Sequence, residues 1–396
     1  MDLSQKGSVI ILGLGRSFGA EHRIRNQVRA LSGRYQIQGY GRAGLDSLIQ
    51  FTAVAMPPKF FYRAVKLLGA LFPRVRLLLE RRFIRPLGQE VKTKNPRFLI
   101  AHDILDGLVA LESGVPYVFD SHEYLPRQFD GMLLWRLTEI AYRRIALQEI
   151  FKQAALITVE GDRVAKAYAK EFSLPIDKLH VVPNMPALRK RLDPVEQTWA
   201  RTRLIHHGIF APQRRLELLI EIVRQLGPEY ELTLMGKGPS DYTAHLKTLA
   251  AQAGNVAIVD PVPYAQIVEA LHVHDVGLVF FGSPHFHHKF MTVPNKFWEC
   301  LQARVPVVVS PDSAMAPYVR EHDCGVVPDV HSAAGYVQAI RRLSAARIRE
   351  MKSKLEEMAF QHSSDSWISQ YADVVTRHCQ RRETSLGTTT SSCDHE

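Results

Sequence analysis

Short apolar runs alternate with longer amphipathic segments along most of the chain, and each run ends in polar or glycine residues. Apolar runs of roughly four to eight residues with such boundaries are typical of buried strands, and apolar positions spaced by three or four residues are typical of helices. The regular alternation predicts parallel βαβ units and therefore an α/β fold class. The strands predicted in the first half are 8–13, 34–40, 98–101, 117–119 and 156–159, with a long helix over 133–155.

The alternation is interrupted between residues 183 and 199, where Pro183, Pro186 and Pro194 lie in a polar, basic stretch. A stretch of this kind is typical of a linker between domains. We therefore expect one domain over 1–190, a second over 200–362, a helix over 363–381 that packs back on the first domain, and a disordered tail over 382–396. The strands predicted in the second domain are 204–205, 232–235, 256–259, 276–280 and 305–309.

Composition sets limits on the class of protein. The 396 residues are 46% hydrophobic and 23% charged, which suits two globular domains. The four cysteines, Cys300, Cys324, Cys379 and Cys393, are far apart and form no Cys-x-x-Cys pair. This argues against a zinc site or a disulfide framework and predicts a cytoplasmic protein. The N-terminus lacks the layout of a signal peptide, and no apolar run is long enough to span a membrane.

Much of the net charge of +10 is concentrated in residues 59–85, where eight basic residues face Glu80 alone, giving 8 − 1 = +7. Apolar residues are interleaved at helical spacing, which favours a surface that docks on an anionic membrane. The alternative is a buried helix pair whose cationic side chains extend to solvent. No nucleic-acid-binding motif accompanies the charge, so we expect no nucleic-acid partner. The eight basic residues are Lys59, Arg63, Lys66, Arg74, Arg76, Arg81, Arg82 and Arg85.

A glycine-rich segment, Gly13-Leu-Gly-Arg-Ser-Phe-Gly19, follows the first predicted strand. It is looser than the dinucleotide-binding fingerprint, and residues 38–42 supply no acidic residue to hold a ribose, which disfavours a nicotinamide enzyme. The other interpretation is a tight turn between a strand and a helix.

Polar residues end two predicted strands of the first half: His102 and Asp103 end one, and Asp120, His122 and Glu123 the other. The carboxyl ends of parallel strands meet at one edge of a sheet, where open α/β folds bind ligands. We expect these side chains to bind hydroxyl groups or to move protons, with His122 best matched to neutral pH. Capping of the following helices is the structural alternative.

In the second half, three basic loops follow predicted strands. Gly208 would let the backbone approach a diphosphate that Arg214 or Arg215 neutralises, and Gly236 flanks Lys237 with a second glycine. A third loop, 292–299, enters a helix through Pro294, with Lys296 in the first turn and Glu299 one turn later, where it can bind a sugar hydroxyl pair. Together they predict a site for a sugar nucleotide. The histidines at 285, 287 and 288 lack a nearby acid or cysteine, so we expect no metal.

The order of these motifs resembles family 4 of the glycosyltransferases with GT-B architecture. The resemblance spans about residues 8 to 380. It implies two Rossmann-like domains with parallel sheets facing a cleft, an N-terminal acceptor domain and a C-terminal nucleotide-sugar domain. The matching segments are His207-Gly-Ile209, Arg214-Arg-Leu-Glu217, Met235-Gly-Lys-Gly-Pro239, Val262-Pro-Tyr264, Val293-Pro-Asn-Lys-Phe-Trp-Glu299 and Pro306-Val-Val-Val309, together with Asp120-Ser-His-Glu123, 155–160 and 181–184.

The resemblance also implies roles for single residues. Glu299 would bind the donor ribose, Arg214 and Lys296 the diphosphate, and His122 the transferred sugar. The remaining implied donor contacts are Gly15, Gly208, Gly236, Lys237, and the backbone around Val293 and Asn295; His102, Asp103, Asp120 and Glu123 would lie on the acceptor side. One position departs from the family pattern, because Met291 stands eight residues before Glu299, where a second Glu is usual.

These observations predict a glycosyltransferase that takes a sugar from a UDP- or GDP-linked donor, without a cofactor, and transfers it with retention. The expected acceptor is a glycan or a lipid-linked acceptor in polysaccharide biosynthesis. The expected location is the cytoplasm, peripheral at the inner face of the membrane, with docking through residues 59–85. Two alternatives remain: a nucleotide-sugar epimerase of the same architecture, and a non-catalytic nucleotide-sugar-binding protein.

Overall fold

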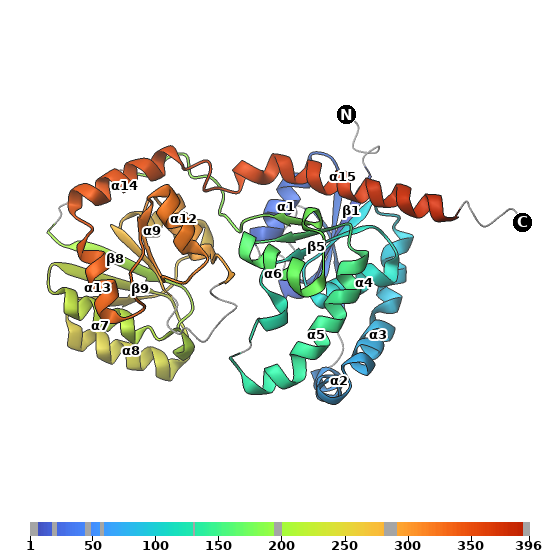
Figure 1. Cartoon of the computed structure of the whole chain (residues 1–396), viewed down its shortest axis with the longest axis horizontal. Helices are drawn as coiled ribbons and strands as arrows, with labels where there is room; N and C mark the ends of the chain where they lie inside the picture. The colour runs from blue at the N-terminus through green and yellow to red at the C-terminus, as the bar shows by residue number, and fades with distance from the viewer. Residues whose placement is uncertain are drawn as a thin grey trace, which may run out of the picture. The chain divides into compact units, whose positions relative to one another are not determined.

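The computed structural model describes residues 7–17, 22–43, 49–55, 59–129, 131–193, 200–280 and 291–390. The chain divides into two compact units (Figure 1). Unit 1 comprises Met1–Pro183 together with Trp367–Glu396, and unit 2 comprises Asn184–Ser366. The boundary falls within the proline-containing stretch from which the sequence predicts a linker.

Unit 1 is built on a seven-stranded parallel sheet with the order β3-β2-β1-β4-β5-β6-β7. The chain adds β2 and β3 on one side of β1 and then β4 to β7 on the other side. This change of side between β1 and β4 creates the switch point where open α/β sheets bind ligands. The strands are β1 (Ser8–Ser17), β2 (Gln36–Ala43), β3 (Gln50–Ala53), β4 (Phe98–Ala101), β5 (Tyr117–Ser121), β6 (Leu156–Val159) and β7 (Leu179–Val181).

Helices cover both faces of this sheet. On one face α1 (His22–Ser32) and the C-terminal helix α15 (Asp365–Thr390) pack on the strands, as Figure 1 shows. Helices α2 to α5 pack against one another, and this group covers the other face of the sheet. They are α2 (Lys59–Leu71), α3 (Pro73–Thr93), α4 (Ile104–Ser113) and α5 (Leu133–Gln153), and α6 (Asp162–Phe172) joins β6 to β7.

The C-terminal helix α15 belongs to the core of unit 1. Tyr371, Ala372 and Val375 are buried in the same apolar cluster as Val9 and Ile100 of the central strands. The helix continues to Thr390, past residue 382, where the sequence places the start of a disordered tail. Residues 391–396 of that predicted tail lie outside the described part of the chain.

Unit 2 repeats the same plan with a six-stranded parallel sheet of order β10-β9-β8-β11-β12-β13. Its switch point lies between β8 and β11. The strands are β8 (Thr202–His207), β9 (Tyr230–Met235), β10 (Val256–Val259), β11 (Val276–Val279), β12 (Val307–Val309) and β13 (Gly325–Val326). The helices are α7 (Glu217–Leu226), α8 (Ser240–Ala253), α9 (Ile267–His272), α11 (Asn295–Gln302), α12 (Met315–His322), α13 (Ala333–Arg341) and α14 (Ala345–Glu357).

The predicted α/β fold class with two Rossmann-like units is therefore confirmed. One local expectation is wrong: the predicted glycine turn after residue 13 is instead a continuation of β1, which pairs again with β2 at Ser17 after an irregularity in register. Among the described residues, no helix has both the length and the apolar composition needed to cross a membrane.

Candidate active site

Two cationic side chains, Arg214 from the turn at 212–214 and Lys296 from α11, lie beside Gly208, which directly follows β8. Gly208 has φ +124°, a conformation that residues with a side chain rarely adopt. A Cβ at this position would lie 3.3 Å from Lys296 Nζ and 3.4 Å from a terminal nitrogen of Arg214. The glycine therefore leaves a space beside two cations, which suits an anionic group such as a diphosphate. We call Gly208, Arg214 and Lys296 the cationic cluster.

A neutral histidine holds Lys296 in this cluster. His206 Nδ1 lies 2.7 Å from the carbonyl oxygen of Leu278 and must donate to it, because a carbonyl can only accept. Burial, followed by the charge of Lys296, keeps the pKa of His206 well below its ordinary value. Its unprotonated Nε2 then accepts from Lys296 Nζ at 3.4 Å. As a hydrogen-bond acceptor, the neutral imidazole thus positions Lys296.

Helix α11 adds a second favourable feature for an anion. It begins after Pro294, and no side chain caps its N-terminus, so the positive end of the helix dipole is not neutralised by a capping side chain and favours an anion. Val293 is half-buried just before the helix, and Asn295 Oδ1 accepts from Asn184 Nδ2 at 2.6 Å. Glu299 lies one turn further on and is 6% exposed.

Glu299 is oriented by the last residue of β8. His207 Nε2 lies 2.7 Å from Glu299 Oε2, and both side chains are buried. The hydrogen bond joins the strand that leads to the cationic cluster to the helix that carries Lys296. The structure thus brings Gly208, Arg214, Lys296 and Glu299 to the carboxyl edge of the second sheet. Lys296 contacts His206, and Glu299 contacts the neighbouring His207.

The loop after β9 has a different reason for its glycines than the sequence suggests. A Cβ on Gly236 would lie 1.9 Å from the carbonyl oxygen of Gly208, and a Cβ on Gly238 would lie 1.9 Å from that of Phe210. The glycines at 236 and 238 thus allow two backbones to pack together, a requirement that the sequence does not display. Lys237 between them is exposed and lines a cavity of about 370 Å³ with Lys247 and other residues of α8 and β10.

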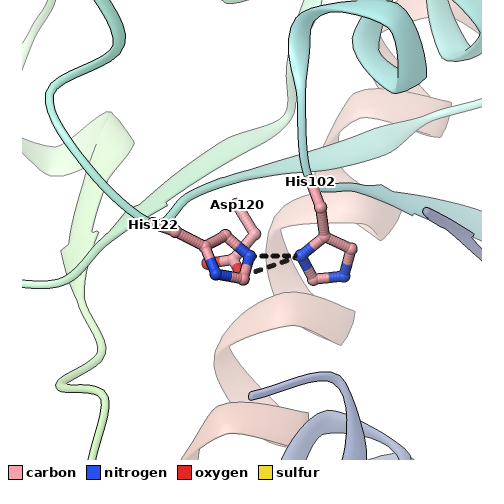
Figure 2. Close-up of side chains that lie close together, drawn as sticks. All are labelled: His102, Asp120 and His122. Carbon is pink, nitrogen blue, oxygen red and sulfur yellow. Dashed lines mark hydrogen bonds and ion pairs between the residues drawn. The ribbon is translucent and has the colours of Figure 1, made fainter. Parts of the chain in front are cut away.

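In unit 1, two histidines meet at the carboxyl ends of β4 and β5. His102 Nδ1 and His122 Nε2 are 2.7 Å apart, and both lie close to Asp120 Oδ2, at 3.2 and 3.3 Å (Figure 2). One ring nitrogen must donate and the other accept, so the pair shares one proton. His102 is fully buried and His122 is 7% exposed, so His122 is the more accessible of the two.

Asp120 is an anchor for this pair, and its carboxylate is enclosed. Arg23 donates to both oxygens at 2.7 and 2.5 Å, Gln27 donates at 2.9 Å, and the Thr158 hydroxyl donates as well. Burial would raise the pKa of Asp120, but the Arg23 guanidinium holds it well below its ordinary value. Asp120 is thus charged, fully buried and bound to protein groups, which is a structural role in place of the acceptor contact expected from the sequence.

Three other predicted residues lie around this edge. Asp103 caps α4 by accepting from Ile104 N at 2.7 Å, which is the structural alternative considered from the sequence. Its other oxygen would be 3.4 Å from a Cβ on Gly15 in β1. Glu123 is half-buried, and its charge, after burial, helps to raise the pKa of Glu160 well above its ordinary value.

The histidine pair and Asp120 form a three-residue group that could hold a metal ion, but their geometry does not fit one. Two nitrogens bound to one zinc ion at about 2.1 Å in tetrahedral geometry would stand more than 3 Å apart, whereas these are 2.7 Å apart. The Arg23 guanidinium also occupies both oxygens of Asp120. The histidines at 285, 287 and 288, from which the sequence predicts no metal, lie outside the described residues.

Sequence reasoning missed several residues of both sites. Arg23 and Gln27 are four residues apart on the buried face of α1, and that polar pair at helical spacing was a signal that could have been used. Asp106 accepts from the N–H groups of Leu14 and His102 at 2.9 and 3.3 Å, beneath the same edge. No sequence pattern indicates the position of Asp106 or the supporting role of His206.

Part of unit 2 resembles a known protein family. Residues 201–346 match the family model described as "Glycosyl transferases group 1", which covers the part of unit 2 that holds the cationic cluster and Glu299. A comparison with curated protein sequences gives no match.

Several solved structures share the architecture of the whole chain. HepE from Anabaena in complex with UDP and glucose has a TM-score of 0.69 and 12% identity, over 94% of this chain and 100% of that chain. Sucrose-phosphate synthase from Thermosynechococcus elongatus has a TM-score of 0.70 and 12% identity, over 98% and 100%. WaaG, a glycosyltransferase involved in lipopolysaccharide biosynthesis, has a TM-score of 0.62 and 13% identity, over 93% and 99%. The chain has the GT-B fold, and the family match supports a nucleotide-sugar glycosyltransferase.

Proposed function

We propose that this protein transfers a sugar from a UDP- or GDP-linked donor to a glycan or lipid-linked acceptor, with retention of configuration, as a peripheral enzyme at the cytoplasmic face of a membrane. Unit 2 binds the donor and unit 1 the acceptor. The observation that carries this proposal is the convergence of Lys296 Nζ and Arg214 on the open side of Gly208. The family match over residues 201–346 supports the nucleotide-sugar glycosyltransferase part of this proposal.

In this mechanism, catalysis comes from placement and charge. Negative charge grows on the diphosphate as its bond to the anomeric carbon lengthens, and Arg214, Lys296 and the N-terminus of α11 stabilise that charge. The acceptor hydroxyl attacks from the same face as the leaving group and gives its proton to the departing phosphate oxygen. No covalent intermediate is required, and a two-carboxylate displacement would need paired acids across the bond.

His122 acts on the transferred sugar in this proposal. Its ring is held by His102 Nδ1 at 2.7 Å and by Asp120, so its orientation is fixed from the buried side. A fixed imidazole can hydrogen-bond a sugar hydroxyl and ease positive charge at the sugar ring. Replacing His122 with Ala should lower kcat more than the affinity for the donor.

A ligand panel tests the donor site. We would measure the thermal shift of the full chain with UDP, GDP, ADP and CMP, and with UDP-sugars and GDP-mannose, because a ligand that binds the folded state raises the melting temperature. We expect one diphosphate nucleotide to stabilise the wild type and the Glu299→Ala variant to lose the effect. The control is Glu221→Ala on the exposed face of α7, which should retain it. A folded protein that responds to none of the nucleotides would contradict the proposal.

Membrane docking through residues 59–85 is supported by their exposed side chains. Leu67, Leu71 and Leu78 are 66%, 78% and 65% exposed, and exposed Arg74 and Arg82 lie among them. Apolar side chains beside cations are the composition that inserts into an anionic headgroup region. Their exposure disfavours the alternative of a buried helix pair. The side chains of 59–63 lie outside the described part of the structure.

Vesicle sedimentation tests docking. Arg74→Glu/Arg82→Glu should abolish binding to vesicles of 70% phosphatidylcholine and 30% phosphatidylglycerol, since each cation near the surface contributes about 1 kcal/mol. The matched control Arg191→Glu/Arg320→Glu makes the same charge change at exposed positions of unit 2 and should bind like the wild type. Equal loss in both variants would mean that only net charge matters, and docking through residues 59–85 would be wrong.

A non-catalytic nucleotide-sugar-binding protein is the second candidate, and Met291 favours it. The residue stands where the resembling family has a Glu for the donor sugar, and it precedes α11 in a half-buried position. Such a protein would bind a UDP-sugar without turnover. Release of UDP from a donor in the presence of a panel of glycan and lipid-linked acceptors distinguishes the two candidates.

A further inference from the structure

A cavity of about 330 Å³ lies between α2 and α5 of unit 1. It is lined by Lys66, Leu67, Met132, Leu134, Trp135 and Thr138. The Thr138 hydroxyl donates to the carbonyl oxygen of Leu134 at 2.9 Å, so its proton is already used within α5. The lining is therefore apolar except for Lys66.

Exposed apolar side chains near the cavity are also found outside residues 59–85. Five residues at the start of α5 and just before it are at least half exposed, and they extend the exposed apolar side chains of α2, which packs against α5. They are Phe129 (50%), Met132 (61%), Leu133 (68%), Leu134 (69%) and Leu137 (64%). Exposed apolar residues gathered in this way mark an interaction site rather than a solvated surface. We call these five residues the α5 apolar group.

The ion pairs connected to Lys66 leave a net positive charge, which favours an anionic occupant. Lys66 Nζ lies 3.1 Å from Glu139, which also pairs with Arg76 at 2.9 Å and Arg143 at 3.5 Å; Arg76 pairs in turn with Glu80. Three cations face two carboxylates, which leaves 3 − 2 = +1. Arg136 of α5 is exposed beside the α5 apolar group.

We propose that this cavity binds one hydrocarbon chain of an anionic bilayer lipid, with the lipid phosphate near Lys66 and Arg136. The inference rests on the docking part of the proposed function and extends it to a defined lipid-chain site. The cavity has the volume of roughly eleven water molecules at about 30 Å³ each, which suits a segment of one hydrocarbon chain and limits its length. An apolar surface that only rests on a bilayer would have no such limit on chain length.

Binding of soluble alkyl phosphates tests the site without a bilayer. Hexyl, octyl and decyl phosphate would be titrated into the full chain by calorimetry, below the concentrations at which they form micelles. Affinity should rise about fourfold for each added CH₂. In Leu134→Gln the rise with chain length should be lost. The matched control Leu78→Gln changes a leucine of similar exposure, 65% against 69%, outside the cavity, and should keep the rise.

Other outcomes overturn the proposal. Equal losses in Leu134→Gln and Leu78→Gln, or no dependence on chain length in the wild type, would mean unspecific adsorption. A dimer in analytical ultracentrifugation that Leu134→Gln dissociates would assign the cavity to a second copy of the chain. Stabilisation by UDP, measured on the same samples, reports the donor site separately. Failure of the lipid-chain site with intact UDP binding thus differs from failure of the proposed enzyme function.

Discussion

His207 and Glu299 are joined by a hydrogen bond of 2.7 Å between Nε2 and Oε2, and both side chains are buried. His207 ends β8 and Glu299 lies in α11, 92 residues later. The bond fixes the orientation of the carboxylate before any ligand arrives, which reduces the ordering cost of binding. If Glu299 binds the donor ribose, His207 is its positioning residue.

The first prediction concerns this pair. His207→Phe should weaken UDP binding about tenfold or more, since a hydrogen bond to a charged group contributes roughly 1.5–3 kcal/mol. His207→Gln, which can still donate, should recover part of the affinity. Calorimetric titration with UDP measures both variants. Unchanged affinity in a folded His207→Phe protein would show that Glu299 does not depend on His207.

The second prediction concerns the packing of the two loops beside the cationic cluster. Gly236→Ala would bring Cβ to 1.9 Å from the carbonyl oxygen of Gly208, so the backbone must move, at a cost of about 1–3 kcal/mol. The control is Gly33→Ala, where a Cβ meets nothing within 4 Å. Urea unfolding at pH 7 should show a lower free energy of unfolding for Gly236→Ala alone. Weaker UDP binding should accompany it, because Gly208 borders the cationic cluster.

Much of the fold was predictable because its central strands are short, continuous apolar runs. Residues 98–101, 156–159 and 256–259 were predicted as strands with the same bounds as β4, β6 and β10. Of these, β10 is an edge strand, but its four residues are all apolar. The strands that were missed, β3, β7 and β13, also lie at sheet edges and are only two to four residues long. An edge strand buries less of its surface, and β3 is largely exposed, so its sequence carries little apolar signal.

The candidate site was predictable only in part. His102 and His122 could be placed at one sheet edge because each follows an apolar run that predicts a strand. The roles of Asp120 and Arg23 could not be inferred, because their pairing joins residues 97 positions apart. Gly236 was noticed for its type, but the reason for a glycine there is the carbonyl oxygen of Gly208. Such contacts depend on tertiary packing, which a single sequence does not display.

The third prediction concerns the buried ion pair under the histidines. Arg23→Met would leave Asp120 charged and without its main partner, which should lower the free energy of unfolding by about 3–5 kcal/mol. Arg23→Met/Asp120→Asn should recover part of the loss because the uncompensated charge is gone. Urea unfolding at pH 7 measures both. If the double variant is no more stable than Arg23→Met, the loss is due to packing and the charge argument is wrong.

The last prediction concerns the pH dependence of stability through Asp106. Burial, followed by the nearby charge of Asp103, raises the pKa of Asp106 to about 6, from an ordinary value of 3.8. Folding therefore favours the protonated form. The stabilisation is fully present below about pH 4 and is lost as the pH rises through about 6, by an amount on the order of 3 kcal/mol.

Comparison with Asp106→Asn isolates this effect, because the amide does not titrate. We would measure the free energy of urea unfolding at pH 4.5, 5.5, 6.5 and 7.5 for both proteins. The wild type should lose stability relative to Asp106→Asn as the pH rises to about 6, and the difference should be constant above pH 7. Exposed Asp241→Asn is the control, since hydrogen bonding to Ser240 lowers the pKa of Asp241, which therefore stays charged over this range. Parallel curves for the wild type and Asp106→Asn would mean that the carboxyl is already ionised at pH 4.5. The N–H groups of Leu14 and His102 would then lower its pKa by more than burial raises it.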